Sequence, residues 1–266
     1  MVLCTTLVAL LSSSAAALQP RLVEHPVLQG LKVGEEVGAG DVRVRRLSGR
    51  PSAFLLRNML DPSDCERIAE AARAAGMERA DTVCGNAWSR RRCDVAWLTP
   101  PRELTEAVAG LLLSDEARLE PGGGCEDLQV LRYADGGSYS MHHDTAREAP
   151  RALTVLYYLN GVGNTWLPLA DDAPPPRSRV EALGRAEERD PERDGVRVGA
   201  PGPGDALAFF NFDADTGGLD WSAVHTALPC DGEKWIANHW FHVGGLFAEE
   251  LAAQEPAAAS RETAPA

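Results

Sequence analysis

The pattern that most constrains the fold is a histidine and an aspartate two residues apart, with a second histidine far along the chain. His142 and Asp144 form the close pair, and His225 is the distant residue. Two imidazoles and one carboxylate form a 2-His-1-carboxylate iron site, which leaves open positions for catalysis. Side chains at i and i+2 of a strand point to the same face. A strand over residues 140–145 therefore aims the close pair into one cavity. His225 must arrive from another strand, as a barrel-like β fold allows.

Length and charge limit the classes of protein. The chain has 266 residues, 44% of them hydrophobic, which is enough for one large β-rich domain with its own core. Its net charge is −13, from 39 acidic and 26 basic residues. Nucleic-acid binders gain affinity by neutralising phosphates, so we expect no nucleic-acid partner. The compact run Arg90–Arg92 is typical of solvated surface, with substrate contact as the alternative.

The N-terminal segment predicts targeting. Residues 1–18 carry no charge and end in small residues, as in a secretory signal peptide. An uncleaved membrane anchor and an organelle leader are the alternatives, and we expect membrane contact only from an anchor. The predicted location is the secretory pathway, in the lumen or membrane of the endoplasmic reticulum. Disulfides form there, and Cys84 and Cys93, which flank a short polar stretch, are the first candidates for a pair.

Composition also divides the chain. Residues 19–50 lack sustained periodicity and are predicted to be a leader or linker with one strand near Val42–Leu47. We expect one domain over residues 51–247 and a disordered tail, rich in Ala and Pro, over residues 248–266. Within the domain, residues 171–200 combine a triple proline with dense charge. That composition buries too little apolar surface to order itself and predicts a mobile insertion, with a lid over substrate as the alternative.

Helix and strand signals indicate a mainly β domain with flanking helices. Asp61 at an N-cap, Pro62 after it and Gly76 as a stop predict one helix. A second helix is expected after Pro101, with apolar residues at helical spacing. Short β runs separated by turns follow, namely Leu128–Tyr133, Tyr139–Asp144, Leu153–Leu159, Ala206–Asn211 and Trp235–Val243.

The metal motif lies within a longer resemblance. The run Arg132-Tyr133…Gly136…Tyr139…His142…Asp144 resembles the R-Y-x-x-G-x-x-Y-x-x-H-x-D signature of prolyl 4-hydroxylase catalytic domains, which are Fe(II)- and 2-oxoglutarate-dependent dioxygenases. Four further blocks resemble the family in the expected order, namely residues 151–160, Thr165–Pro168, residues 204–211 and the stretch from His225 to Trp240. The resemblance covers roughly residues 52–245.

The resemblance implies a fold and an activity. The fold is a double-stranded β-helix, or jelly roll, with N-terminal helices. The cofactors are Fe(II), 2-oxoglutarate as cosubstrate, O2 and L-ascorbate. The reaction couples 2-oxoglutarate decarboxylation, which yields succinate and CO2, to hydroxylation of a peptidyl proline. The metal ligands are His142, Asp144 and His225, and strand alternation turns His143 away.

Lys234 is the expected partner for the far carboxylate of 2-oxoglutarate. A lysine buried on an apolar strand without an anion costs several kcal/mol, which an incoming carboxylate offsets. The alternative is a surface lysine that snorkels past Trp235. The spacing from His225 to Lys234 is one residue shorter than is usual in the family. A deletion in the intervening turn leaves both strands in place, whereas a register shift turns Lys234 to the wrong face.

Further residues are assigned through the resemblance. Tyr133, Thr165 and Trp240 match positions that line the cosubstrate pocket, with simple packing as the alternative. The aromatic residues that we expect along a groove for an extended Pro-rich peptide are Trp88, Trp97 and Tyr139. The alternative functions are a non-catalytic metal-binding jelly roll and a dioxygenase acting on a small molecule or another side chain. The sequence does not predict the oligomeric state.

Overall fold

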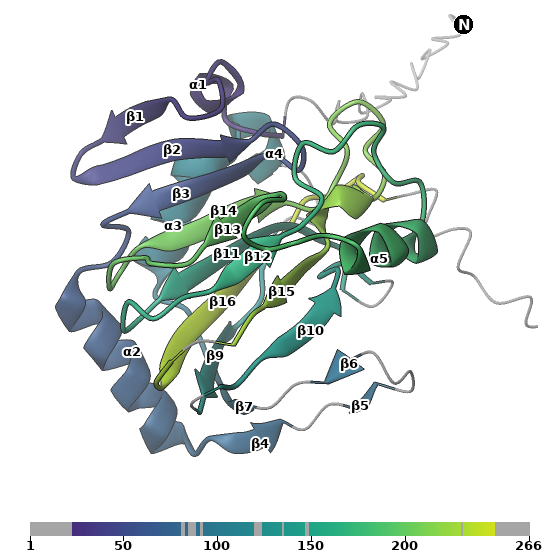
Figure 1. Ribbon diagram of the computed structural model, residues 1–266. Coiled ribbons are helices and arrows are strands. Elements are labelled where there is room, and N and C mark those ends of the chain that lie inside the picture. Colours follow the sequence, from purple (N-terminus) through teal and green to yellow (C-terminus); the bar gives the residue numbers. More distant parts are fainter. Residues whose placement is uncertain are drawn as a thin grey trace, which may run out of the picture.

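Two antiparallel sheets form the centre of the protein (Figure 1). The computed structural model describes residues 23–80, 83–84, 89–90, 93–119, 124–134, 136–146, 149–229 and 231–247. Over these residues, a ten-stranded sheet and a four-stranded sheet enclose a core to which both contribute. Leu167 and Val198 of the small sheet pack there with Phe209 and Ile236 of the large one. The two sheets therefore lie face to face, as in a sandwich.

The chain passes between the two sheets in the order of a jelly roll. The strands concerned are β9 (Leu128–Tyr133), β10 (Tyr139–His142), β11 (Arg151–Tyr158), β12 (Thr165–Leu167), β13 (Val196–Val198), β14 (Ala206–Phe210), β15 (His225–Ala227) and β16 (Lys234–His242). The large sheet contains β14-β11-β16-β9 and the small sheet is β10-β15-β12-β13. This arrangement confirms the fold implied by the resemblance.

Further strands widen the large sheet on both sides. Beyond β14 lie β3 (Ala53–Arg57), β2 (Val42–Ser48) and β1 (Glu36–Ala39), and beyond β9 lie β7 (Cys93–Leu98) and β4 (Glu78–Ala80). The shorter elements are α1 (Pro26–Gln29), β5 (Val83–Cys84), β6 (Ser89–Arg90), α4 (Asp115–Leu119), β8 (Gly124–Cys125) and the 3-10 helix η2 (Trp221–Ala223).

The prediction that residues 19–50 form a leader or linker is wrong for residues 23–50, the part that the structure describes. Val23, Leu28 and Val44 are buried in the main core cluster, and β2 pairs with β3 along most of its length. Periodicity misses this segment because its apolar residues are spread over short elements that only the large sheet brings together. The domain therefore begins before residue 51. The strand near Val42–Leu47 is confirmed.

Two helices cover the outer face of the large sheet, as predicted. Helix α2 (Pro62–Ala75) begins where the Asp64 backbone N–H donates to Asp61 Oδ1 at 2.9 Å, and its C-cap is Gly76. Such a cap contributes about 1 kcal/mol. Helix α3 (Arg102–Leu112) follows Pro101 and buries Leu104, Val108 and Leu112. Both helices pack in the main core cluster, away from the space between the sheets.

The segment predicted to be a mobile insertion, residues 171–200, is instead packed and largely hydrogen-bonded. It contains α5 (Arg179–Glu187) and β13, and it buries Ala182 and Ala186. Its charges pair with one another, because Asp172 accepts hydrogen bonds from Arg185 at 2.6 Å and from Arg189 at 2.5 Å. Composition does not predict that this segment packs, because few of its residues are apolar. Two alanines are nevertheless enough to bury one face of a short helix.

Several predictions concern residues that the structure does not describe. These are the targeting segment (residues 1–18), the tail (residues 248–266), the Arg90–Arg92 side chains, Trp88, and the Cys84 side chain of the predicted disulfide with Cys93. Over the described part of the chain, no helix is both long enough and apolar enough to span a bilayer.

Candidate metal centre

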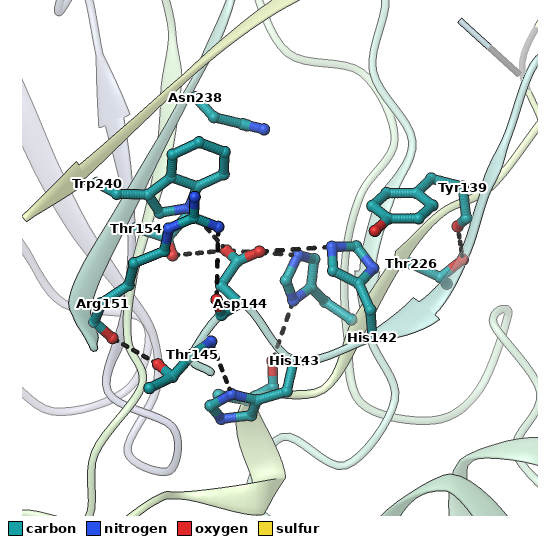
Figure 2. Close-up of polar contacts among 12 residues, drawn as sticks. Tyr139, His142, His143, Asp144, Thr145, Arg151, Thr154, Thr226, Asn238 and Trp240 are labelled. Carbon is teal, nitrogen blue, oxygen red and sulfur yellow. Dashed lines mark hydrogen bonds and ion pairs between the residues drawn. The ribbon is translucent and has the colours of Figure 1, made fainter. Parts of the chain in front are cut away.

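Two paired strands, β10 and β15, bring the predicted ligands together. His142 ends β10 and lies opposite His225, which begins β15, in the antiparallel register. Asp144 follows His142 by two residues, just beyond the strand end. One donor atom from each residue lies within 4.8 Å of the others. His142 Nε2 is 3.5 Å from Asp144 Oδ1 (Figure 2). His225 Nε2 is 3.8 Å from Asp144 Oδ2. Two imidazoles and a carboxylate at this separation fit one ferrous ion.

The backbone sets the tautomer of both imidazoles. His142 Nδ1 lies 2.9 Å from the Ser140 carbonyl oxygen, and His225 Nδ1 lies 3.1 Å from the Ala223 carbonyl oxygen. A carbonyl oxygen only accepts hydrogen bonds, so each Nδ1 carries a hydrogen, and in the neutral form of each ring the lone pair is on Nε2. This is the outer support that metal-binding histidines usually have, and it directs both Nε2 atoms at the carboxylate.

The carboxylate of Asp144 is anchored through one oxygen. Thr154 Oγ1 donates to Asp144 Oδ2 at 2.7 Å, and Trp240 Nε1 donates to the same oxygen at 3.1 Å. Thr154 and Trp240 are direct partners in the register between β11 and β16. Asn211 Nδ2 donates to Thr154 Oγ1 at 3.0 Å, which directs the threonine hydrogen at the carboxylate. The two donors hold Oδ2, so Oδ1 is the oxygen directed at a metal.

Arg151 packs against the ring of Trp240. The Arg151 guanidinium carbon lies 3.5 Å from the centre of the Trp240 ring, a cation–π contact (Figure 2). Arg151 donates to both oxygens of Glu126 at 2.7 Å, and His242 Nε2 lies 3.0 Å from Glu126 Oε1. Burial raises the pKa of Glu126, but hydrogen bonds from Arg151 and His242 lower it to about 2. Glu126 is therefore an anion that fixes the guanidinium.

Asp144 and His225 are in the protonation states that a metal needs. Burial raises the pKa of Asp144, but His225 and His142 beside it hold that pKa well below its ordinary value. Burial, together with the neighbouring His142, lowers the pKa of His225 to about 4. At neutral pH, His225 is therefore neutral and Asp144 is ionised. Metal binding displaces few protons from such a site.

Lys234 lies on the face of β16 that looks between the sheets. Its side chain is 1% exposed, and Nζ lies 4.3 Å from the centre of the Tyr133 ring, its register partner on β9. Ile236 and Trp240 share this face, since Ile236 packs in the core between the sheets and Trp240 reaches Asp144. The shorter spacing after His225 therefore leaves the strand in register. Thr165 is buried on β12 of the facing sheet.

Comparison with known proteins identifies the family. The family model for the 2OG-Fe(II) oxygenase superfamily matches residues 128–242. Probable prolyl 4-hydroxylase 8 of Arabidopsis thaliana is 31% identical over 225 residues, covering 79% of this chain and 74% of that protein. The chain belongs to the prolyl 4-hydroxylase family of 2OG-Fe(II) oxygenases.

Two further proteins are similar to the chain. Probable prolyl 4-hydroxylase 4 of Arabidopsis thaliana is 28% identical over 214 residues, covering 76% of this chain and 70% of that protein. The viral collagen prolyl hydroxylase of Paramecium Bursaria Chlorella virus-1 superposes with a TM-score of 0.48 at 22% identity, covering 73% of this chain and 96% of that one.

As a family member, the chain places its predicted residues as follows. His142, Asp144 and His225 converge, and Lys234 and Thr165 are buried in the space between the sheets or on strands that border it. Trp240, predicted to line the cosubstrate pocket, donates to a metal ligand. His143 points away from the metal ligands, as predicted (Figure 2). Its Nε2 is 3.1 Å from the Asp220 carbonyl oxygen.

The sequence reasoning missed the residues that support the ligands. Thr154 and Arg151 belong to one of the blocks that resemble the prolyl 4-hydroxylase family, but nothing in one sequence shows that they lie behind Asp144. Glu126 precedes the first of those blocks and carries no signal of its own. A register prediction for β11 against β16 would have found Thr154, because it pairs with Trp240.

Replacing Trp240 with phenylalanine is expected to weaken iron binding. The substitution keeps an aromatic ring beneath Arg151 but removes the N–H that holds Asp144 Oδ2. Loss of such an outer support lowers metal affinity by about 10- to 100-fold. Anaerobic Fe(II) titration measures the change. Trp97, which is 48% exposed and lies 6.2 Å from Trp240 between ring centres, supplies the matched Trp97→Phe control. Equal affinity in the two variants would contradict the anchoring role.

The metal-free protein is expected to lose stability as the pH falls from about 6.5 to about 4. Burial is the largest cause that lowers the pKa of His143, His225 and His239 to about 4 each. The unfolded chain, with histidine pKa values near 6.5, binds protons in this window that the folded chain does not. Stability is complete above the window and falls on acidification, by roughly 2–3 kcal/mol for each group.

Urea unfolding of the metal-free protein at a series of pH values measures this loss. His239 lies apart from the metal ligands and contacts the Tyr157 hydroxyl at 3.2 Å. A His239→Gln variant removes one of the three groups and is expected to show a shallower dependence on pH. A dependence identical to that of the parent protein would show that His239 does not titrate in this window.

Proposed function

We propose that this protein hydroxylates proline residues in peptides, with 2-oxoglutarate as cosubstrate. One observation carries the proposal: His142, Asp144 and His225 converge, and each imidazole has its Nδ1 beside a backbone carbonyl oxygen. The names of its curated relatives, which are prolyl 4-hydroxylases, supply the substrate class. L-ascorbate as a reductant belongs to the same proposal.

The protein residues would hold and orient the metal and the cosubstrate, while the cofactor supplies the reactivity. When bound, Fe(II) with 2-oxoglutarate and O2 supplies the oxidant for an unactivated C–H bond, and the cosubstrate leaves as succinate and CO2. His142, His225 and Asp144 Oδ1 would hold the metal. The buried Lys234 ammonium, which lies over the Tyr133 ring, would neutralise the far carboxylate of 2-oxoglutarate, and Thr165 is buried on the facing sheet.

Aromatic side chains next to the metal ligands favour a peptide substrate. Tyr139 lies 3.9 Å from His142 between ring centres, and Trp97 keeps 48% of its surface exposed although it neighbours Trp240. Exposed aromatic faces are the usual docking surface for Pro-rich segments. We propose the secretory pathway as the location, on the basis of the uncharged residues 1–18.

The test starts with binding. Anaerobic addition of Fe(II) and then 2-oxoglutarate to the full chain is expected to produce the weak visible band of the chelate, and Asp144→Ala is expected not to show it. Succinate formation is then followed with a Pro-rich peptide, with the same peptide carrying Ala in place of Pro, and with free proline. Stimulation by the first peptide alone supports the proposal.

The other outcomes select the alternatives. A chelate band without any stimulated turnover would indicate a non-catalytic metal-binding module. Stimulation by free proline, or equally by both peptides, would indicate a small-molecule substrate or another side chain. Full turnover in the Asp144→Ala variant would refute the ligand assignment.

A further inference from the structure

We infer that helix α5 positions the two histidine ligands, so that iron affinity depends on the alanine face of this helix. The inference rests on the proposed metal site. The helix belongs to residues 171–200, a segment whose composition gives no hint of a role in the site. It lies beside β10 on the small sheet (Figure 1).

The packing of α5 reaches the neighbours of both histidines. Ala182 and Ala186 are buried in a separate small cluster with Leu169 and Val224, and Met141 and Trp221 pack against this cluster. Met141 immediately precedes His142, and Val224 immediately precedes His225. The alanine face therefore bears directly on the two chain segments that present the imidazoles.

The helix lies behind the metal site, outside the space between the sheets. Adjacent residues of a strand point to opposite faces. Since His142 faces the metal site, Met141 faces the other way, toward α5. A contact on this side does not cover the substrate. It fixes where β10 and the start of β15 lie relative to each other, and this spacing decides whether His142 and His225 reach one ion.

A third contact joins the same cluster to the residues on either side of Asp144. The Trp221 ring of η2 lies 5.2 Å from the His143 ring, and His143 Nδ1 accepts from the Thr145 backbone N–H at 3.1 Å. These two residues flank Asp144. The cluster under α5 thus touches a neighbour of each metal ligand, although it contains none of the ligands itself.

Ion pairs hold the C-terminal end of helix α5 in place. Asp172 Oδ2 accepts from Arg185 at 2.6 Å and from Arg189 at 2.5 Å. Arg185 also donates to the Pro174 carbonyl oxygen at 2.7 Å. Asp172 follows the turn that leads away from β12, so the pairs tie α5 to the small sheet. These partly buried pairs hold the helix against the cluster rather than leaving it as a free loop.

Variants on the two faces of α5 separate positioning from general stability. Ala182→Leu and Ala186→Leu add volume on the buried face, where the side chains are 0% and 2% exposed. Val180→Leu enlarges a side chain on the same helix that is 83% exposed, and serves as the matched control. The measurements are the Fe(II) dissociation constant, taken anaerobically well below the unfolding temperature, the unfolding temperature itself, and kcat at saturating iron.

We expect the Fe(II) dissociation constant to rise about tenfold or more in Ala182→Leu and Ala186→Leu. We expect kcat at saturating iron to stay within about threefold of the parent value, and Val180→Leu to match the parent protein. Should an overpacked variant fail to fold, Asp172→Asn loosens the helix without adding volume and is expected to raise the dissociation constant severalfold.

Folded variants that bind Fe(II) as the parent protein does would overturn the inference, even where their unfolding temperature falls, because α5 would then only stabilise the domain. Failure of the parent protein itself to bind Fe(II) would refute the proposed function, and the inference with it. The two failures are therefore distinguishable in one set of titrations.

Discussion

His142→Ala is expected to abolish 2-oxoglutarate turnover, whereas His143→Asn, at the adjacent position, is expected to retain iron binding. His142 Nε2 faces the Asp144 carboxylate, and its Nδ1 is held by the Ser140 carbonyl oxygen. Removing this imidazole leaves two protein ligands for the metal. Metal catalysis contributes several kcal/mol, and each 1.4 kcal/mol is tenfold in rate, so turnover should fall by at least roughly 1,000-fold.

The His143→Asn variant is the matched control because it removes an imidazole one residue away. His143 is buried and turned to the Asp220 carbonyl oxygen and the Thr145 backbone N–H, and an asparagine retains a polar group for these partners. We expect a lower unfolding temperature and an Fe(II) dissociation constant that rises far less than in His142→Ala, because all three metal ligands remain. Anaerobic titration and peptide-dependent succinate formation measure both variants. The reverse pattern, with iron lost in His143→Asn and kept in His142→Ala, would reassign the ligand.

The sequence predicts the jelly roll well where strands are long and helices are capped. Leu128–Tyr133 is β9 to the residue, and Asp61 caps α2 as expected. Such elements carry their own local signals, namely apolar runs and capping side chains. Strands as short as β12 and β13 have no comparable signal, since three residues cannot show a period. They form because the facing sheet buries them.

The ligands of the site were predictable, but their supports were not. His142, Asp144 and His225 form a pattern of residue types that iron chemistry requires. The anchors of Asp144 are a threonine and a tryptophan, which are common as packing residues and become informative only when β11 and β16 are aligned. Glu126 and Arg151 meet through a pair of strands and a short turn, so their contact depends on tertiary structure alone.

The sequence also predicts the end of β10 two residues too late. The strand was expected to reach Asp144, but hydrogen bonding ends at His142. The side chains of His142 and Asp144 still meet, as residues i and i+2 of a strand would, because His142 Nε2 lies 3.5 Å from Asp144 Oδ1. The side-chain direction was therefore predicted correctly from a strand that is too long.

Lys234→Met is expected to raise the 2-oxoglutarate concentration needed for half-maximal turnover by at least about 100-fold. Lys234 is 1% exposed on the face of β16 that carries Trp240, deep between the sheets. A buried carboxylate that loses its charged partner costs about 3–5 kcal/mol, and each 1.4 kcal/mol is a factor of ten. Methionine keeps most of the volume and the apolar stem, so the core between the sheets stays filled.

Lys32, the only other lysine of the chain, is exposed and provides the Lys32→Met control. Succinate formation at saturating peptide, with 2-oxoglutarate varied, separates the two parameters. We expect the half-saturating concentration to rise in Lys234→Met, while kcat at saturating cosubstrate falls far less, because the lysine contacts the end of the cosubstrate that does not react. The Lys32→Met variant should match the parent protein. A fall in kcat with an unchanged half-saturating concentration would place Lys234 away from the cosubstrate, since a residue that binds only the unreacting carboxylate must act through affinity.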